Sequence, residues 1–188
     1  LAVKNDISIF SIHTALDNSI KGVNMKLCEV LGINNPKILM PKTKTIKKLT
    51  TYLPKKNAEN LRKKLFGIGA GSIGKYENCS FSFEGFGTFK GNKNSNPTLG
   101  VKQKDTEVEE VCVNITFLKH LEEMVLSGLR EVHPYEEIAY ELNTLENVNE
   151  NIGMGMVGEL KQAISEKELF ELIENRLGSK FLKHSKLL

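Results

Sequence analysis

The sequence has few of the features that mark membrane, secreted or nucleic-acid-binding proteins. Its 188 residues include no tryptophan, no apolar run of membrane-spanning length and nothing that resembles a signal peptide. The net charge of +3 is too small to require an anionic partner, and the lysines lack the interleaved aromatic residues of a single-strand-binding surface. We therefore expect no membrane association and do not favour a nucleic-acid partner.

Cysteine is also scarce, and its three copies are scattered. Cys28, Cys79 and Cys112 are odd in number and have neither the spacing of a zinc knuckle nor that of a redox motif. We interpret them as reduced thiols that pack as small apolar groups, which indicates a cytoplasmic protein.

The residues that are present fit an ordinary globular protein with its own core. Hydrophobic residues make up 40% of the chain and charged residues 26%. The chain opens with Leu1 instead of Met and ends in a strand-like piece, residues 180–185. We therefore expect a fragment of a longer protein, with sequence missing at both ends.

The first candidate site follows the apolar run Ile7–Ile12, which predicts a buried strand. His13 and Asp17 come where this strand would end, and in open α/β sheets ligands bind beyond the carboxyl ends of strands. The two side chains are therefore candidate metal ligands or acid/base groups. The alternative is that a histidine and an aspartate four residues apart simply occur in a loop.

An α/β pattern continues after this candidate site. Asn18 or Ser19 is expected to cap a helix that Gly32 ends, and residues 38–40 predict a short strand closed by Pro41. A strand, a helix and a strand in this order are typical of a parallel sheet.

The pattern changes between about residues 44 and 146. The predicted order is strand, helix, hairpin-like strands, strand, helix and strand, which is close to the split βαβ, ferredoxin-like arrangement. The apolar positions behind this prediction lie in residues 49–53, 58–68, 79–83, 111–117, 121–129 and 138–142. Asn57 is the expected cap of the first helix.

The α/β pattern resumes after a polar linker at residues 147–151. The glycine-rich segment Gly153–Leu160 predicts a strand, and a capping box formed by Ser165 and Glu168 predicts the helix that Gly178 ends. We therefore predict an α/β core interrupted by an inserted α+β domain. The expected boundaries are 1–43 for the first core segment, 44–148 for the insert and 149–188 for the return segment.

Two further segments have both a functional and a structural interpretation. Glycines at Gly67–Gly74 are suited to holding a phosphate, but they follow a helix instead of opening one, so a helix stop is the simpler interpretation. The segment His133–Glu137 brings an imidazole, a phenol and two carboxylates to a loop, where sites are common. The alternative is a proline-induced helix end with solvated polar residues.

These motifs, in this order, make the chain resemble the Nif-three-like family (Ngg-one-interacting factor three), whose bacterial members are labelled GTP cyclohydrolase type-two homologues. The residues His13–Asp17 resemble its His-Thr-Asn-Leu-Asp motif, with Ala15 in place of Asn. The return to the core, Gly153–Leu160, also resembles the family, with Met156 where Arg is usual. The other matching segments are 22–24, 31–32, 69–76, Phe81, 85–89, 96–97 and 133–136.

The resemblance implies a fold, a cofactor and an assembly. The fold would be an α/β core with an inserted domain similar to the PII and CutA folds. The cofactor would be two divalent metal ions per subunit in the complete protein (Zn, Mn or Fe), with Asp17 as the one ligand that maps onto this chain and His13 beside the metals. The assembly would be a trimer through the insert and a hexamer in the complete protein.

Two functions are compatible with these implications. The first is a metal-dependent hydrolase that acts on a nucleotide-like small molecule, with His13 as a catalytic residue. The second is a non-catalytic module that assembles subunits or senses a ligand through the insert. Gly67–Gly74 and His133–Glu137 would then shape a subunit interface or a lid, with His133 and Glu136 as the candidate cleft or lid residues. The replacements at Ala15 and Met156 leave the substrate open.

Overall fold

The chain divides into two compact units in the computed structural model, which describes residues 1–186. The inserted unit is Thr43–Asn147, and the flanking unit consists of Leu1–Lys42 together with the segment from Val148 onward. The last two residues of the expected return segment, 187–188, lie outside the described residues. Within the described part, no helix is both long and apolar enough to cross a bilayer.

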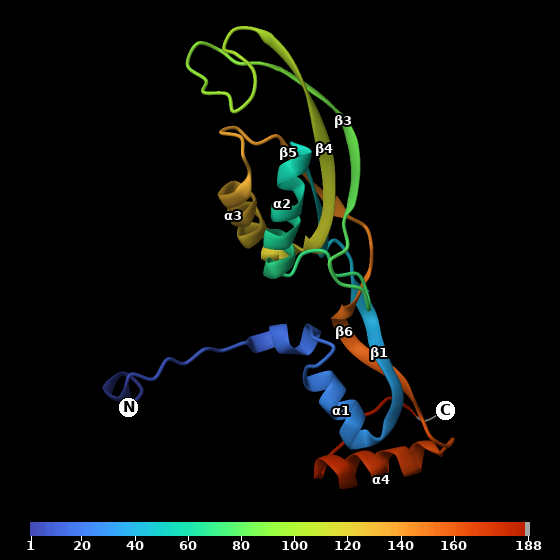
Figure 1. Cartoon of the computed structure of the whole chain (residues 1–188). Helices are drawn as coiled ribbons and strands as arrows, with labels where there is room; N and C mark the ends of the chain where they lie inside the picture. The colour runs from blue at the N-terminus through green and yellow to red at the C-terminus, as the bar shows by residue number, and fades with distance from the viewer. Residues whose placement is uncertain (187–188) are drawn as a thin grey trace. The chain divides into compact units, whose positions relative to one another are not determined.

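The inserted unit has the ferredoxin-like topology that the alternating apolar pattern predicts. Its elements are β2 (Ile46–Leu53), α2 (Lys55–Ile68), β3 (Phe81–Lys90), β4 (Asp105–Leu118), η3 (Lys119–Leu121), α3 (Glu122–Val132) and β5 (Tyr140–Leu145). The strands form one antiparallel sheet in the order β3-β4-β2-β5, and α2 and α3 lie side by side against it (Figure 1). The fold class is therefore mixed α/β, with a split βαβ arrangement in this unit.

One face of this sheet carries the core. Leu49 of β2 pairs with Ile115 of β4, and both side chains are buried under the helices. The apolar stripe of α2, formed by Ala58, Leu61 and Leu65, is also buried, as the 3.6-residue period predicts. A contiguous core of this kind stabilises the unit through burial of apolar surface.

The start of α2 differs from the expectation. Asn57 was the expected cap, but the helix begins at Lys55, directly after Pro54, and Asn57 lies within its first turn. Proline has a backbone φ that suits the entry to a helix, so the chain passes from β2 into α2 without a polar cap.

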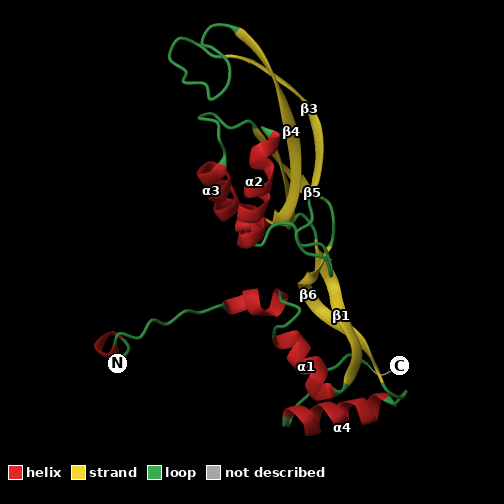
Figure 2. Cartoon of the chain, viewed as in Figure 1, coloured by secondary structure: helices red, strands yellow, loops and turns green. Residues whose placement is uncertain are grey.

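The flanking unit is built around two long antiparallel strands (Figure 2). Its elements are η1 (Val3–Asn5), η2 (His13–Asn18), α1 (Val23–Leu31), β1 (Ile33–Lys42), β6 (Asn149–Leu160) and α4 (Glu166–Leu177). The prediction of a parallel strand–helix–strand unit is wrong, because β1 pairs antiparallel with β6, which returns after the insertion. The register of this pairing shifts twice, between Asn34 and Lys37 and between Pro41 and Lys42. Pro36 and Pro41 lie at these two shifts, and neither has the backbone N–H that the ladder needs.

Three local expectations in the flanking unit are also wrong. Residues 7–12 form no strand, and Ile9 and Phe10 are 83% and 86% exposed, because no described element packs on them. Helix α1 begins at Val23 after Gly22, and neither expected residue caps it: the Asn18 side-chain amide donates to the Thr14 carbonyl oxygen, and the Ser19 hydroxyl accepts from the Lys21 N–H. The strand-like piece at residues 180–185 has no regular structure.

The helix ends of the flanking unit agree with the sequence. Gly32 closes α1 in the left-handed conformation, with φ of 74°. Ser165 and Glu168 form a reciprocal capping box at the start of α4, and Gly178 follows its end with φ of 64°. Both helices are therefore bounded by local interactions that the sequence encodes directly.

Candidate functional site

The element η2, a tight turn of 3₁₀ helix, presents the two side chains of the first candidate site to solvent. His13 and Asp17 are both exposed, and no described residue forms a hydrogen bond or ion pair with the His13 ring or the Asp17 carboxylate. His13 has φ of 49°, a left-handed conformation that is uncommon outside glycine. Such conformations persist only where the surrounding structure fixes them, and they are concentrated at functional sites.

The backbone of η2 is fixed by polar side chains next to it. The Asn18 side-chain amide donates to the Thr14 carbonyl oxygen at 2.8 Å, and the Asn24 amide donates to the Asp17 carbonyl oxygen at 2.8 Å. The Ile20 backbone N–H donates to the Asn151 carbonyl oxygen at 3.0 Å, which ties the turn to β6. The turn is thus held on both sides while its two titratable side chains remain free of partners among the described residues.

Gly22 is required by the close approach of η2 to the start of α1. A Cβ atom at this position would collide with the backbone carbonyl oxygen of Leu16. Only glycine allows the chain to turn this tightly, so the turn and the helix that follows it have a fixed separation.

The donor set of η2 suits a divalent metal ion, but it is incomplete. Carboxylate oxygen and imidazole nitrogen are common ligands of Zn, Mn and Fe. However, the described residues contain no group of three or more His, Cys, Asp or Glu side chains that could hold a metal ion. His13 and Asp17 therefore do not form a metal centre by themselves.

The second candidate site, His133–Glu137, lies in the inserted unit directly after α3. His133 is 8% exposed, and its Nδ1 accepts a hydrogen bond from the Tyr135 backbone N–H at 3.2 Å. Its Nε2 lies 3.1 Å from the Tyr52 carbonyl oxygen, so Nε2 carries the proton and donates. Burial lowers the pKa of His133, while the hydrogen bond to Tyr52 and the charge of Glu110 act in the opposite direction. The ring is therefore held neutral inside the unit.

Tyr135 and Glu110 form a hydrogen-bonded pair that connects this loop to β4. The Tyr135 hydroxyl donates to Glu110 Oε1 at 2.7 Å, and the Tyr135 and His133 rings meet edge to face at 5.3 Å. Burial and the neighbouring Glu110 carboxylate raise the pKa of Tyr135. The phenol therefore stays protonated and remains a hydrogen-bond donor.

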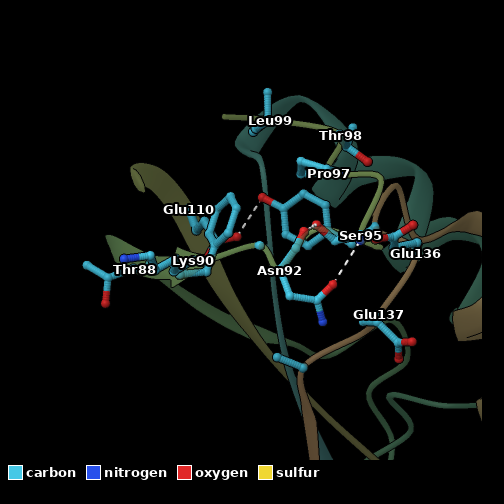
Figure 3. A pocket seen from close by; sticks show the side chains of 15 residues that line it. Thr88, Lys90, Asn92, Ser95, Pro97, Thr98, Leu99, Glu110, Glu136 and Glu137 are labelled. Carbon is cyan, nitrogen blue, oxygen red and sulfur yellow. Dashed lines mark hydrogen bonds between the residues drawn. The ribbon is translucent and has the colours of Figure 1, made fainter. Parts of the chain in front are cut away.

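A pocket of about 370 Å³ opens beside this pair (Figure 3). Glu136 and Glu137 lie on one side of it. The β3–β4 turn, which is the connection of residues 91–104 between these strands, provides Pro97, Thr98 and other lining residues. His133 is not among the residues that line the pocket. The structure thus places Glu136 at the cavity and His133 behind it.

The β3–β4 turn is attached to the His133–Glu137 loop by two hydrogen bonds. The Asn96 backbone N–H donates to Glu136 Oε1 at 2.6 Å, and the Thr98 hydroxyl donates to the Pro134 carbonyl oxygen at 2.8 Å. Sequence reasoning found the loop but missed Glu110 and Thr98. No local sequence signal marked these two residues, because only the fold brings β4 and the β3–β4 turn to this loop.

The glycines of Gly67–Gly74 serve as a helix stop. Gly69 adopts φ of 102° and its N–H bonds back to the Phe66 carbonyl oxygen at 2.9 Å. The Gly71 N–H donates to the Thr116 carbonyl oxygen at 2.7 Å, so these two backbone amides are already occupied. The segment ends α2 and joins it to the sheet.

Comparison with known proteins identifies a matching family and relatives that agree with one another. A model of the family described as Duf34/NIF3 (NGG1p interacting factor 3) matches residues 1–187. The chain is 37% identical over 176 residues to the GTP cyclohydrolase 1 type 2 homolog of Bacillus subtilis, covering 93% of this chain and 47% of that protein. The Listeria innocua protein of the same name is 36% identical over 165 residues, covering 87% and 44%.

A solved structure agrees with these relatives. The Bacillus cereus protein related to NIF3 superimposes with a TM-score of 0.78 at 35% identity, covering 95% of this chain and 47% of that chain. The chain thus spans about half the length of the curated relatives it matches.

Proposed function

The chain belongs to the Duf34/NIF3 (NGG1p interacting factor 3) family, and on this premise we propose that Asp17 is a ligand of a centre for two divalent metal ions. The observation that carries the proposal is the turn η2. Its backbone is anchored by Asn18, Asn24 and β6, yet the Asp17 carboxylate and the His13 ring have no partner among the described residues. Because the backbone that carries the carboxylate is already ordered, a cation would not have to order the turn when it binds, which favours metal binding.

The centre needs ligands beyond His13 and Asp17. Because the described residues bring no third ligating side chain to this turn, the remaining ligands would come from the portion of the longer relatives that this chain does not span. The metal would be Zn, Mn or Fe, all of which accept carboxylate and imidazole ligands.

The reaction that we propose is hydrolysis of a nucleotide-like small molecule in the cytoplasm. The proposal of the substrate class rests on the name of the curated relatives, GTP cyclohydrolase 1 type 2 homolog. Divalent ions would supply Lewis-acid polarisation of the bond that is cleaved. His13, exposed one turn before Asp17, would hold or transfer a proton at its imidazole nitrogen.

Metal analysis of the natural protein tests this assignment. We expect Asp17→Asn to lower the bound Zn, Mn or Fe per subunit, as measured by plasma mass spectrometry after dialysis. Asp6→Asn is the matched control, because Asp6 is an exposed aspartate in the same unit and should leave the metal content unchanged. Equal metal content in the two variants would refute Asp17 as a ligand.

A second candidate function, subunit assembly through the inserted unit, is favoured by the open face of its sheet. The side chains of Phe81 and Phe83 on the edge strand β3 are 70% and 53% exposed, and they share a face with Cys112 and Asn114 of β4, opposite the core. Exposed aromatic patches on sheets commonly mark contacts between proteins. We propose that this face forms the contact of a trimer, and that the complete protein is a hexamer.

The molar mass of the chain in solution, measured by light scattering, tests whether this face of β3, and not the opposite face, forms the contact. Phe81→Ser with Phe83→Ser should convert a trimer into a monomer. Phe86→Ser is the control, since Phe86 is 70% exposed on the opposite face of β3. A wild-type chain that stays monomeric at high concentration would contradict the assembly function.

A further inference from the structure

The pocket between the β3–β4 turn and the His133–Glu137 loop has the size and the walls of a small-molecule site. Its volume of about 370 Å³ falls within the range of protein cavities that enclose small ligands. Pro97 and Leu99 supply apolar wall and Thr98 supplies a polar group (Figure 3). Phe89 adds apolar wall and Tyr135 adds a second polar group. We infer that this cavity binds a small organic cation, an alkylammonium with a short apolar chain, independently of the metal centre proposed for the flanking unit.

The charge around the cavity is negative. Three carboxylates, Glu110, Glu136 and Glu137, line it against a single cation, Lys90. The Lys90 ammonium lies 3.5 Å from the Asp105 carboxylate, which does not line the cavity, so its charge is balanced there. The carboxylates therefore lack a matching positive charge among the lining residues, and an anionic ligand would be repelled.

The carboxylates keep hydrogen-bonding capacity for such a ligand. Glu110 and Glu136 each use one oxygen within the protein, for the Tyr135 hydroxyl and the Asn96 backbone N–H. Glu137 has no partner among the described residues. An ammonium group offers three donors and no acceptor, so it complements a set of carboxylate acceptors.

Tyr135 adds a second feature that suits a cation. Its hydroxyl is fixed by Glu110 at 2.7 Å, and the ring belongs to the lining of the cavity. Aromatic rings attract ammonium groups through their negative faces, and the attraction increases where water is partly excluded. The apolar walls would meanwhile contact the alkyl part of the ligand.

A bare metal ion fits the cavity less well. No three ligating side chains in the described part of the chain come close enough together to hold one. The carboxylates instead border the cavity separately, and the hydrogen bonds from Asn96 and Thr98 hold the turn at the His133–Glu137 loop. A preformed cavity with separated acceptors suits an extended organic cation, because little of the wall must be ordered on binding.

Titration of the whole chain with three probes of equal length tests the inference. We would add n-butylammonium, n-butanol or butyrate to the ¹⁵N-labelled chain and follow the amide resonances of Thr98, Tyr135 and Glu137. We expect butylammonium to shift these resonances at lower concentration than butanol does, and butyrate to leave them unchanged. Tighter binding of butanol or butyrate would overturn the inference, as would butylammonium shifts confined to other parts of the chain.

Charge-removing variants identify the carboxylates involved. We expect Glu137→Gln to weaken butylammonium binding by about two- to fivefold, the range of a solvent-exposed charge pair. Glu123→Gln, a change of the same kind at an exposed position of α3 outside the cavity, should leave the affinity unaltered. The inference fails if the two variants weaken binding equally or if Glu137→Gln has no effect. Metal content plays no part in these measurements, so their outcome is separate from that of the Asp17 test.

Discussion

The two units have similar kinds of elements but very different interiors. In the inserted unit, α2 and α3 bury a contiguous core against β2 and β4. In the flanking unit, the buried apolar side chains among the described residues are those of Cys28 and Ile38, while Leu39, Met40 and Met154 of the strand pair are more than half exposed. Because apolar burial is the main source of stability, the comparison indicates that the inserted unit is stabilised by its own residues far more than the flanking unit is.

The largest effect should come from truncating one leucine in each unit. Leu61 of α2 is fully buried, so Leu61→Ala should lower the free energy of unfolding by about 2–5 kcal/mol, through lost apolar contact and the cavity left behind. Leu27 of α1 is 39% exposed, and Leu27→Ala should cost no more than about 1 kcal/mol. Urea denaturation followed by circular dichroism, with hydrogen exchange to separate the units, measures both. Equal costs would break the comparison.

A pair of glycine-to-alanine changes should have opposite signs in the two units. Gly22→Ala places a methyl group against the Leu16 carbonyl oxygen and should destabilise the flanking unit by about 1–3 kcal/mol, displacing η2. Gly67 lies exposed in α2 with open space around it, so Gly67→Ala should stabilise the inserted unit by up to about 1 kcal/mol.

Thermal unfolding together with the amide shifts of residues 13–18 checks this pair. A Gly22→Ala variant whose turn resonances are unchanged would show that η2 is not tightly fixed. In that case the structural support for a preorganised Asp17 would be lost.

The inserted unit should also respond to pH through His133. Burial lowers the pKa of this histidine below its ordinary value of 6.5, so the unfolded chain binds the proton more readily than the folded chain does. Stability from this group is complete above pH 6.5 and is lost as the pH falls from there through the lower pKa of the folded state. Protonation would also place a hydrogen on Nδ1, so that this nitrogen could no longer accept the hydrogen bond from the Tyr135 N–H.

Urea unfolding between pH 7.5 and 4.5 measures this response. His133→Gln should flatten the fall in stability of the inserted unit at acid pH, although it is less stable than wild type at neutral pH. His120→Gln, at an exposed histidine before α3, should keep the wild-type pH dependence. Identical slopes for His133→Gln and wild type would exclude His133 as the source.

The contrast in interiors also explains how far the sequence could be interpreted. Alternation at Val111, Val113, Ile115 and Phe117 predicted a half-covered strand correctly, because the helices that cover it belong to the same unit. The apolar run Ile7–Ile12 predicted a buried strand wrongly. An apolar pattern shows that a segment could pack against other elements, but it does not show that the described residues include an element that packs on it. The antiparallel pairing of β1 with β6 joins segments separated by the whole insertion, which local patterns do not encode.

The candidate sites follow the same division. His13 and Asp17 could be identified from their motif, but the anchoring of their turn by Asn24 and β6 could not, because it depends on the fold. The loop after α3 was recognisable from His133–Glu137. Its partner Glu110 lies 25 residues away on β4, and the two come together only because β2 pairs with both β4 and β5, the strand that follows this loop.

The smallest predicted effect concerns one ion pair in each unit. In the inserted unit, Lys47 and Glu122 approach to 2.6 Å with side chains 16% and 31% exposed, whereas Lys26 and Glu29 of α1 approach to 2.9 Å with side chains 74% and 58% exposed. Double-mutant cycles with Lys→Met and Glu→Gln should give a coupling energy of about 1 kcal/mol for the first pair and about 0.3 kcal/mol for the second. Salt should weaken the second pair more, because an exposed pair is screened more effectively. A larger coupling energy for the exposed pair would contradict the comparison, because it would show that the ion pair of the inserted unit is no better shielded from solvent than that of the flanking unit.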